Sequence, residues 1–400
     1  MPSIDYLAID ADNHYYEPDD CCTRHLESRF RDRAVHVVRG TDGSGEWRFG
    51  DKPLSFHRYP RDQVMEPGEY RAFMAGQAFD PDAPPKFVPA SSPAFADRDA
   101  RIKVMDRFRL QAVMMLPSFG LAFEADCRED PPAAAANVRA FNRWLEDDWG
   151  YSYQDRIIAP PAISLFDLDT AVEELERVLV AGARVIMIRP GPIFDRSLAD
   201  PTLDPFWSRV DEARIPVVLH IGVSGYNPVV GAMWGENPDA SEKEMSPFLY
   251  YSCFGKRPIM DTVACFILHN LFGRYPNIRM LSIENGCKWI PGLLEDMDRS
   301  AMVTVSTQGE KNTSLIGGAL RAKPSEIFKQ HFYVAPFFEE SVPDLVDWVG
   351  ADHTLFGSDW PHPEGVREPL DFLDEVDGLA APVVRRIMRD NSADLFGLAT

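Results

Sequence analysis

Short apolar runs recur along the whole chain, each followed by polar residues and then by a helical pattern. The runs are nearly continuous rather than alternating, as expected of parallel strands that are buried on both faces. Strand and helix alternate throughout, which predicts a single-domain closed (β/α)8 barrel over residues 1–400, with a doubly wound open sheet as the alternative. The eight expected strands are residues 6–10, 112–116, 157–165, 185–189, 216–222, 278–283, 331–334 and 355–358. The expected helices are residues 99–108, 133–149, 167–182, 204–214, 261–275 and 293–300.

A long gap at about residues 15–97 interrupts this alternation and is rich in Arg, Asp, Pro and aromatic residues. A structureless loop of that length is uncommon in a compact domain. We therefore expect an insertion after the first strand, and in a barrel this connection lies over the active-site face. Residues 43–97 are predicted to form a wall over the barrel mouth, with Trp47, His57 and Arg58 as substrate contacts. A second long connection, residues 223–257, is another candidate lid or pocket wall.

Charge and composition exclude several classes of function. The formal net charge is −21, with 62 acidic and 41 basic residues, so phosphate backbones and anionic membrane surfaces would be repelled. The six cysteines show no zinc-knuckle or redox spacing. The sequence shows neither a signal-peptide pattern nor an apolar run long enough to cross a bilayer, which predicts a reducing, cytoplasmic location.

Polar residues stand where three of the expected strands end. Asp12 and His14 follow the first apolar run, two positions apart, so both side chains point to the same side of an extended segment. His220 stands near the end of the fifth run, and Asp359 follows the eighth. The carboxyl ends of barrel strands converge on the active site. Two imidazoles and two carboxylates suit Zn²⁺ or Mn²⁺, with coordination positions left for water and substrate.

With these motifs the chain resembles the amidohydrolase superfamily, and most closely the amidohydrolase-related branch that includes the aminocarboxymuconate-semialdehyde decarboxylases. Further similarity lies in FGRYPNIR at residues 272–279, IENGCKWIP at 283–291 and NSADLFG at 391–397. The resemblance covers nearly the whole chain except the insertion. It implies a barrel enzyme with one divalent metal ion, no organic cofactor and a small-molecule substrate, and it leaves a homo-oligomer open.

Two positions depart from the family pattern. The family usually has His-x-His after the first strand, where this chain has Asp12-x-His14. The added carboxylate shifts metal preference towards Mn²⁺ or Mg²⁺ without excluding Zn²⁺. The family's catalytic His after the sixth strand is replaced by Glu284. This replacement weakens the resemblance to the decarboxylases, because that His belongs to their proposed chemistry.

Each candidate residue has a functional and a structural interpretation. Asp359 is expected to be both ligand and proton carrier, because a buried acid needs a cation or metal beside it. Asp12 could instead cap a turn. Glu284 could be catalytic or a structural ion-pair partner, and a protonated Glu284 would donate a hydrogen bond to a substrate oxyanion. The candidate substrate contacts are Arg189, His362, Trp289 and His57; Arg189 has a salt bridge, and His362 a turn, as the structural alternative.

Three functions are compatible with this site. The leading hypothesis is hydrolysis of a C–N or C–O bond in a small carboxylated molecule by a metal-activated water, with Asp359 as the proton carrier. The second hypothesis is non-oxidative decarboxylation of an aromatic or unsaturated acid, in which protonated Asp359 delivers a proton to carbon. The third is a barrel that binds a ligand without turnover, since a fold does not guarantee activity.

Overall fold

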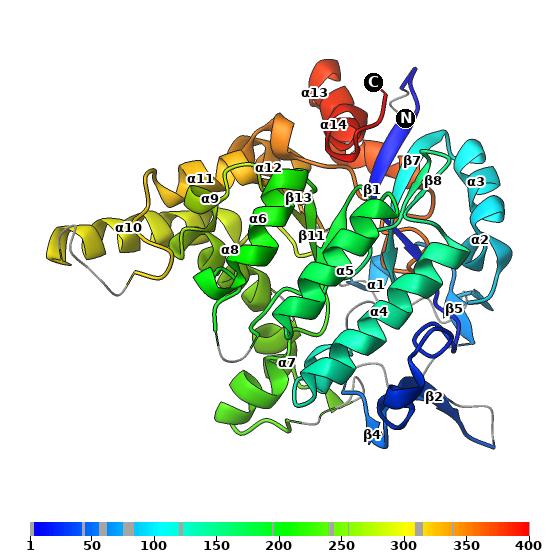
Figure 1. Cartoon of the computed structure of the whole chain (residues 1–400). Coiled ribbons are helices and arrows are strands. Elements are labelled where there is room, and N and C mark those ends of the chain that lie inside the picture. The colour runs from blue at the N-terminus through cyan, green and yellow to red at the C-terminus, as the bar shows by residue number, and fades with distance from the viewer. Residues whose placement is uncertain are drawn as a thin grey trace.

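Parallel strands form the centre of the molecule in the computed structural model (Figure 1). One sheet has the order β1-β7-β9-β8 and a second has the order β10-β11-β12-β13, and every neighbouring pair is parallel except β8 with β9. The strands are β1 (Ala8–Tyr15), β7 (Leu110–Pro117), β8 (Ser152–Tyr153), β9 (Ile157–Ile158), β10 (Ile186–Ile188), β11 (Val217–His220), β12 (Met280–Ile283) and β13 (Phe332–Ala335). The structure describes residues 4–41, 45–55, 62–74, 84–119, 123–193, 196–238, 240, 244–254, 256–308, 315–337 and 340–399.

Single bridges connect the two sheets. A parallel bridge between Ala162 and Met187 joins the segment after β9 to β10. On the other side, Val334 pairs with Thr354 and Asn13 pairs with Trp360, so residues 354–360 lie between β13 and β1. Neighbouring parallel strands therefore follow one another in chain order, and the last segment returns to the first. The expected mixed α/β architecture is confirmed.

Helices cover the outside of the strands, and several begin at acidic caps (Figure 1). Asp97, Asp130 and Asp167 each accept a backbone N–H of the first helical turn through a side-chain oxygen, which satisfies a donor that the helix itself leaves without a partner. The helices are α3 (Arg98–Arg107), α4 (Pro131–Asp148), α5 (Leu168–Val180), α6 (Asp204–Ala213), α8 (Lys256–Leu268), α9 (Leu271–Arg274), α10 (Ile290–Gln308), α11 (Pro324–His331), α12 (Val342–Val349), α13 (Ala381–Arg385) and α14 (Asn391–Phe396). Every helix in the described ranges is too short or too polar to cross a bilayer.

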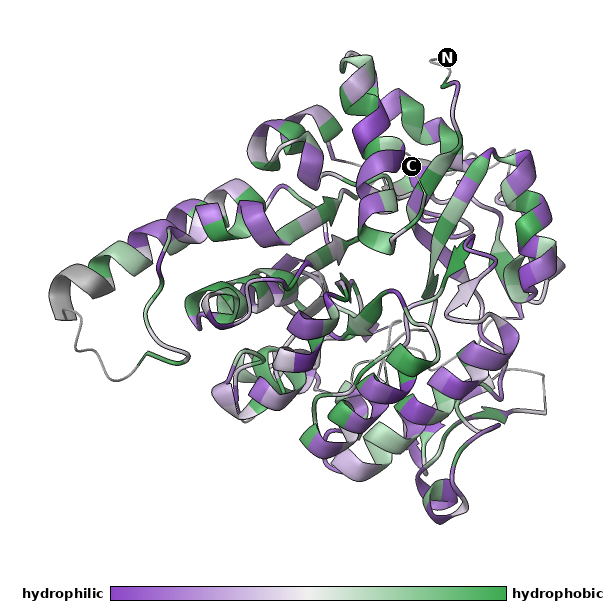
Figure 2. Ribbon diagram, turned by 45° about the horizontal axis from the view of Figure 1, so that its top comes forward, coloured by the Kyte–Doolittle hydropathy of each residue, from purple (hydrophilic) through white to green (hydrophobic). Residues whose placement is uncertain are grey.

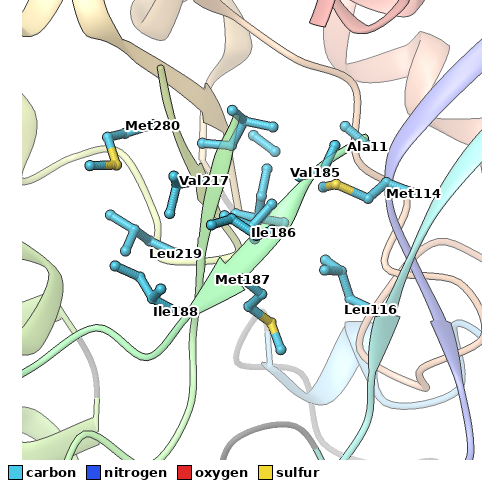
Figure 3. Packing of buried hydrophobic residues seen from close by; sticks show 14 of the residues in the cluster. Ala11, Met114, Leu116, Val185, Ile186, Met187, Ile188, Val217, Leu219 and Met280 are labelled. Carbon is cyan, nitrogen blue, oxygen red and sulfur yellow. The ribbon is translucent and has the colours of Figure 1, made fainter. Parts of the chain in front are cut away.

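The core lies between the strands and this layer of helices. Side chains of β7, β10, β11 and β12 pack together there, among them Met114, Met187, Leu219 and Met280 (Figure 3). Each fully buried aliphatic side chain of this kind contributes roughly 1.5–3 kcal/mol to folding. In Figure 2 the helices carry both hydrophilic and hydrophobic residues, which suits elements with one face on the core and one in water.

Residues 15–97 contain regular structure of their own. The strands β2 (Val35–Arg39), β3 (Gly45–Phe49) and β4 (Lys52–Pro53) form an antiparallel sheet, and β5 (Gln63–Met65) pairs with β6 (Phe87–Pro89). The 3-10 helix η1 (Ser28–Arg33) and two short α-helices, α1 (Arg71–Met74) and α2 (Pro93–Ala96), are the other helical elements in the described part of the segment. Trp47 stacks on Phe119 just beyond the end of β7, with ring centroids 4.3 Å apart. This contact attaches the segment to the carboxyl-terminal side of β7.

Several expected boundaries are wrong for identifiable reasons. The expected strand at 157–165 shrinks to β9 and one bridge, because Pro160 and Pro161 cannot donate to a ladder. The expected strand at 355–358 is held by bridges on either side of it and is not a regular strand. The expected helix at 261–275 is split into α8 and α9 at Asn270, whose φ is 53°.

Candidate metal centre

The first strand brings two of the expected ligands into the centre of the molecule. Asp12 and His14 on β1 are both buried, and Asp12 Oδ1 lies 3.1 Å from His14 Nε2. The register of β1 against β7 shifts between Asp10 and Asn13, so this stretch departs from regular strand pairing. Irregular pairing of this kind re-aims side chains and is frequent beside active sites.

A buried carboxylate that the sequence analysis did not single out holds this stretch in place. Asp10 Oδ1 accepts the backbone N–H groups of Asp12 at 3.1 Å and of Ser358 at 3.0 Å. Its Oδ2 accepts Asn13 Nδ2–H at 2.9 Å and the Ser358 hydroxyl at 2.5 Å. Asp10 therefore ties β1 to the segment that carries Asp359. The available signal was an acid inside an otherwise apolar strand run.

His220 stands at the end of β11 with its ring orientation fixed. Its Nδ1 lies 2.8 Å from the carbonyl oxygen of Ile221, and because a carbonyl can only accept, Nδ1 carries the proton. Its Nε2 then faces the site, 3.1 Å from Glu284 Oε2 and 3.8 Å from Asp12 Oδ1. Metal-binding histidines commonly have their second nitrogen bound in this way.

Glu284 and Asp359 complete the cluster from the ends of two further segments. Glu284 follows β12 with φ 57°, and Asp359 has φ 56°. For residues other than glycine, sparsely populated conformations of this kind cost about 1–3 kcal/mol and are concentrated at functional sites. His14 Nε2 lies 3.2 Å from Asp359 Oδ1 and 3.9 Å from Glu284 Oε2. Asp12, His14, His220, Glu284 and Asp359 thus come together.

His362 contacts Asp359 through one ring nitrogen and Ser118 through the other. The Ser118 hydroxyl donates to the Tyr15 carbonyl at 2.7 Å, so it accepts from His362 Nε2–H at 2.8 Å. The other ring nitrogen, Nδ1, lies 2.7 Å from Asp359 Oδ1. The His362 ring also stacks on His14, with centroids 3.9 Å apart. The sequence did not indicate Ser118, because a single serine after a strand has no distinctive pattern.

The donor set fits a divalent cation. Two overlapping groups of four, Asp12-His14-His220-Glu284 and His14-Glu284-Asp359-His362, have ligand atoms within 4.8 Å of one another. One N–H on His14 can satisfy only one of the three carboxylates around it. Asp359 Oδ2 is buried without a hydrogen-bond partner among the described residues. A cation at this point would compensate both the carboxylates that His14 cannot satisfy and the unpartnered Asp359 oxygen. Mixed carboxylate and imidazole ligands suit Mn²⁺ or Zn²⁺.

The carboxylates of the cluster titrate differently. Burial, and next the charge of Asp359, raises the pKa of Glu284 to about 7. Burial also raises the pKa of Asp359 to about 7, although His362 opposes the shift. Burial alone would raise the pKa of Asp12, but hydrogen bonds with His14 and His220 lower it on balance. Asp12 is therefore the carboxylate that keeps its negative charge most firmly.

The imidazoles respond to the same charges. Burial and the neighbouring His362 lower the pKa of His14 to about 4, so its ring is neutral near pH 7. Burial would lower the pKa of His220, but Asp12 and Glu284 raise it to about 10. Likewise Asp359 outweighs burial and raises the pKa of His362 to about 9. The carboxylates therefore stabilise the protonated, positively charged forms of His220 and His362.

A pocket lies against the carboxylates of the cluster. Its lining includes Asp12, Glu284 and Asp359 together with Phe337, Phe372 and other residues of the last third of the chain. Arg71 of α1 also lines it and forms an ion pair with Glu375. Arg71, a residue of the 15–97 segment, therefore lines the pocket that holds the candidate ligands.

Of the remaining expected substrate contacts, Arg189 and Trp289 are not part of this pocket's lining, and His57 lies outside the described residues. Arg189 is buried, with Nε 2.8 Å from Glu124 Oε2 and Nη2 2.7 Å from the Pro192 carbonyl. This arrangement matches the salt bridge proposed as its structural alternative. Trp289 is 6% exposed and donates its indole N–H to the carbonyls of Asn285 and Gly286. His57, like Arg58, lies outside the described residues.

The fold and the cluster define an α/β protein whose strand ends gather carboxylates and imidazoles around one point. The chain belongs to the amidohydrolase family, whose model matches residues 9–398. An amidohydrolase from Mycobacterium avium subsp. paratuberculosis K-10 is 36% identical, with a TM-score of 0.88 over 99% of this chain and 100% of that one.

More distant solved structures share the fold. One is 2,6-dihydroxybenzoate decarboxylase from Rhizobium, 17% identical, with a TM-score of 0.61 over 98% of this chain and 99% of that chain. Another is dihydroxybenzoic acid decarboxylase from Polaromonas sp. JS666 with bound manganese and the inhibitor 2-nitroresorcinol. It is 18% identical, with a TM-score of 0.60 over 98% and 97%. None of the curated proteins compared with the chain matches it.

Proposed function

We propose that this chain is a metal-dependent hydrolase that cleaves a C–N or C–O bond in a small carboxylated molecule. The observation that carries the proposal is the convergence of Asp12, His14, His220, Glu284 and Asp359 at one point beside a pocket. Buried carboxylates at such short range to one another are costly unless a cation compensates them. Membership of the amidohydrolase family supports the same reaction class.

One divalent ion, Mn²⁺ or Zn²⁺ with Mg²⁺ as a further possibility, would be held by Asp12, His14, His220 and Asp359, with Glu284 beside them. When bound, such an ion polarises a carbonyl group and makes water a stronger nucleophile at neutral pH. The Ile221 carbonyl fixes the tautomer of His220 that presents a lone pair to the ion. Manganese in the dihydroxybenzoic acid decarboxylase structure supports this choice of metal.

Proton movement is assigned to Asp359 and His362. Asp359 Oδ1 is held by His362 and His14, whereas its Oδ2 is the buried oxygen without a hydrogen-bond partner in the described ranges. The Asp359 carboxylate can take a proton from the attacking water and return it to the leaving group. His362, held by Ser118, keeps the carboxylate in this orientation.

Substrate binding is assigned to the pocket. The Arg71 guanidinium, which pairs with Glu375, can also donate to a substrate carboxylate. Residues 15–97 would then form the wall over the site, in agreement with the Trp47–Phe119 stack and with Arg71 in the lining. We further infer that the parallel strands close into a (β/α)8 barrel, supported by the bridges that return from β13 through residues 354–360 to β1.

Decarboxylation of an aromatic or unsaturated acid is the second candidate. It is favoured by the full-length structural similarity to two dihydroxybenzoate decarboxylases. The same residues would serve both reactions, because a protonated Asp359 could deliver its proton to carbon. Glu284 in the place of the family's strand-six histidine favours hydrolysis.

One screen separates the two candidates. The manganese- and zinc-loaded protein is incubated with carboxylated lactones and amides and with hydroxybenzoates, and both acid production and CO2 release are recorded. Hydrolysis predicts acid release from lactones or amides without CO2. CO2 release from a hydroxybenzoate, with no turnover of lactones or amides, would overturn hydrolysis in favour of decarboxylation. An Asp359→Asn variant, which cannot carry the proton, is the control that assigns turnover to this site.

A further inference from the structure

A buried arginine lies behind the strand that carries Asp12 and His14. Arg101 on α3 is 1% exposed, and α3 packs on β7 while α2 packs on β1 (Figure 1). The oxygens that accept hydrogen bonds from its guanidinium are neutral in the described part of the chain. Arginine is seldom buried so completely unless a carboxylate pairs with it. The position of Arg101 therefore needs an explanation beyond the packing of α3.

The three nitrogens of the guanidinium bond to the ligand strand and to α2. Nη2 donates to the His14 carbonyl at 2.6 Å, and Nη1 donates to Asn13 Oδ1. Nε donates to the carbonyl of Ala94 on α2 at 2.6 Å. Because the planar guanidinium presents its N–H groups in a fixed fork, the three bonds together set the position of β1 relative to α2.

The same guanidinium contacts the segment that carries Asp359. Its central carbon lies 4.6 Å from the ring centroid of Trp360, within the range of a cation–π interaction. Trp360 follows Asp359 directly, and its carbonyl accepts the His14 N–H at 2.8 Å. Arg101 therefore contacts both of the chain segments that supply Asp12, His14 and Asp359.

Asn13 connects Arg101 to the buried carboxylate of Asp10. The Asn13 amide oxygen accepts from Arg101, and its Nδ2–H donates to Asp10 Oδ2 at 2.9 Å. Asp10 in turn accepts the backbone N–H groups of Asp12 and Ser358. Burial lowers the pKa of Arg101 to about 9, and the charge of Asp10 is the largest effect that opposes this shift. One hydrogen-bonded chain thus runs from a cation on α3 to the two ligand segments.

We propose that Arg101 is a positioning residue of the metal centre, acting through Asn13 and Asp10, a role that rests on the metal-dependent function proposed above. Groups behind the ligands that orient them are commonly worth roughly 10- to 100-fold in metal affinity. Charge alone predicts the opposite sign, because a guanidinium repels a divalent cation and its removal would tighten binding. A loss of metal affinity on replacing Arg101 therefore reports positioning and not charge.

Calorimetric titration of the metal-free, full-length protein with Mn²⁺ tests the proposal. Arg101→Met removes the guanidinium fork and should raise the Mn²⁺ dissociation constant by roughly 10- to 100-fold. Arg101→Lys keeps the charge but not the planar fork, and it should raise the constant as well. Arg274→Met is the matched control, because Arg274 also donates to backbone carbonyls, those of His269 and Ala199, away from the cluster. Its Mn²⁺ affinity should equal that of wild type.

A further variant keeps the test valid if the Arg101 variants unfold. Asn13→Ala removes the contact between Arg101 and Asp10 and leaves both charges in place, and it should weaken Mn²⁺ binding about tenfold. Circular dichroism checks that each variant is folded under the titration conditions.

Several outcomes would overturn the positioning role. Wild-type or tighter Mn²⁺ affinity in a folded Arg101→Met, Arg101→Lys or Asn13→Ala protein would do so and would leave the metal centre standing. An equal loss of affinity in Arg274→Met would also contradict it, because the effect would then not be specific to the ligand segments. A wild-type protein that binds no Mn²⁺ would overturn the metal centre itself, and the role of Arg101 with it.

Discussion

His220 Nε2 and Glu284 Oε2 lie 3.1 Å apart, at the ends of the neighbouring parallel strands β11 and β12. The contact places a carboxylate beside a candidate metal ligand. Burial and Asp359 raise the pKa of Glu284 to about 7, so its protonated form is well populated at neutral pH. Glu284 can then donate a hydrogen bond to a substrate oxyanion.

Substitutions of Glu284 test this role. Glu284→Gln keeps a hydrogen-bond donor, and we expect it to retain kcat within about tenfold of wild type. Glu284→Ala removes the donor, and we expect kcat to fall by about 100- to 1000-fold, as for the loss of an oxyanion donor. Steady-state kinetics on a substrate from the screen measures both. Near-wild-type rates for the two variants would reduce Glu284 to a structural role.

Arg71 should determine affinity for the substrate carboxylate. Arg71→Gln removes the charge from the pocket, and we expect KM to rise by roughly 10- to 100-fold while kcat changes little, because a charge-assisted hydrogen bond is lost. Arg367→Gln is the matched control, since Arg367 pairs with Glu69 at the surface. An unchanged KM in the Arg71 variant would place the carboxylate site elsewhere.

Metal affinity should increase with pH between about 6 and 8. In the metal-free chain the pKa of the ligand His220 is raised to about 10 and that of the ligand Asp359 to about 7. The metal must displace these protons, and each proton released strengthens binding about tenfold per pH unit while the group remains protonated. Competition titrations with a chelator of known affinity, corrected for its own protonation, measure the slope. A flat profile would mean that these groups are not ligands.

The Arg189–Glu124 pair should contribute to stability rather than to substrate binding. Both side chains are almost fully buried, so Arg189→Ala leaves an uncompensated carboxylate and should cost about 3–5 kcal/mol of unfolding free energy. Replacing both residues with Leu should recover much of that loss. Denaturant unfolding measures the effect. A stable Arg189→Ala protein with a raised KM would instead support the substrate contact expected from the sequence.

The alternation of apolar runs and helical patterns was sufficient to predict the mixed α/β architecture, because burial on both faces imposes the composition of a parallel strand. The predicted ends of strands and helices were less accurate where a proline or a left-handed residue ends the element. Prolines shortened β9, and Asn270 in the left-handed region ended α8. Neither effect depends on hydrophobic periodicity, so the periodic pattern could not reveal it.

The sequence also identified Asp12, His14, His220 and Asp359, which the structure brings together with Glu284. Each of them stands near or just after the end of an apolar run that marks a strand. Supporting contacts were not predictable in the same way. Asp10 bonds to Ser358, and His362 bonds to Ser118, across several hundred residues of chain. Which strand ends face each other, and through which hydroxyl, depends on tertiary packing.

Metal content tests the proposed centre most directly. Elemental analysis of protein purified without chelator should show close to one equivalent of manganese or zinc per chain, and His220→Ala should abolish binding. His269→Ala is the control, because His269 contacts Ser197 away from the cluster and its loss should leave the metal in place. A wild-type protein that stays empty after reconstitution, or a His220→Ala variant that keeps a full equivalent, would contradict the proposed ligand set.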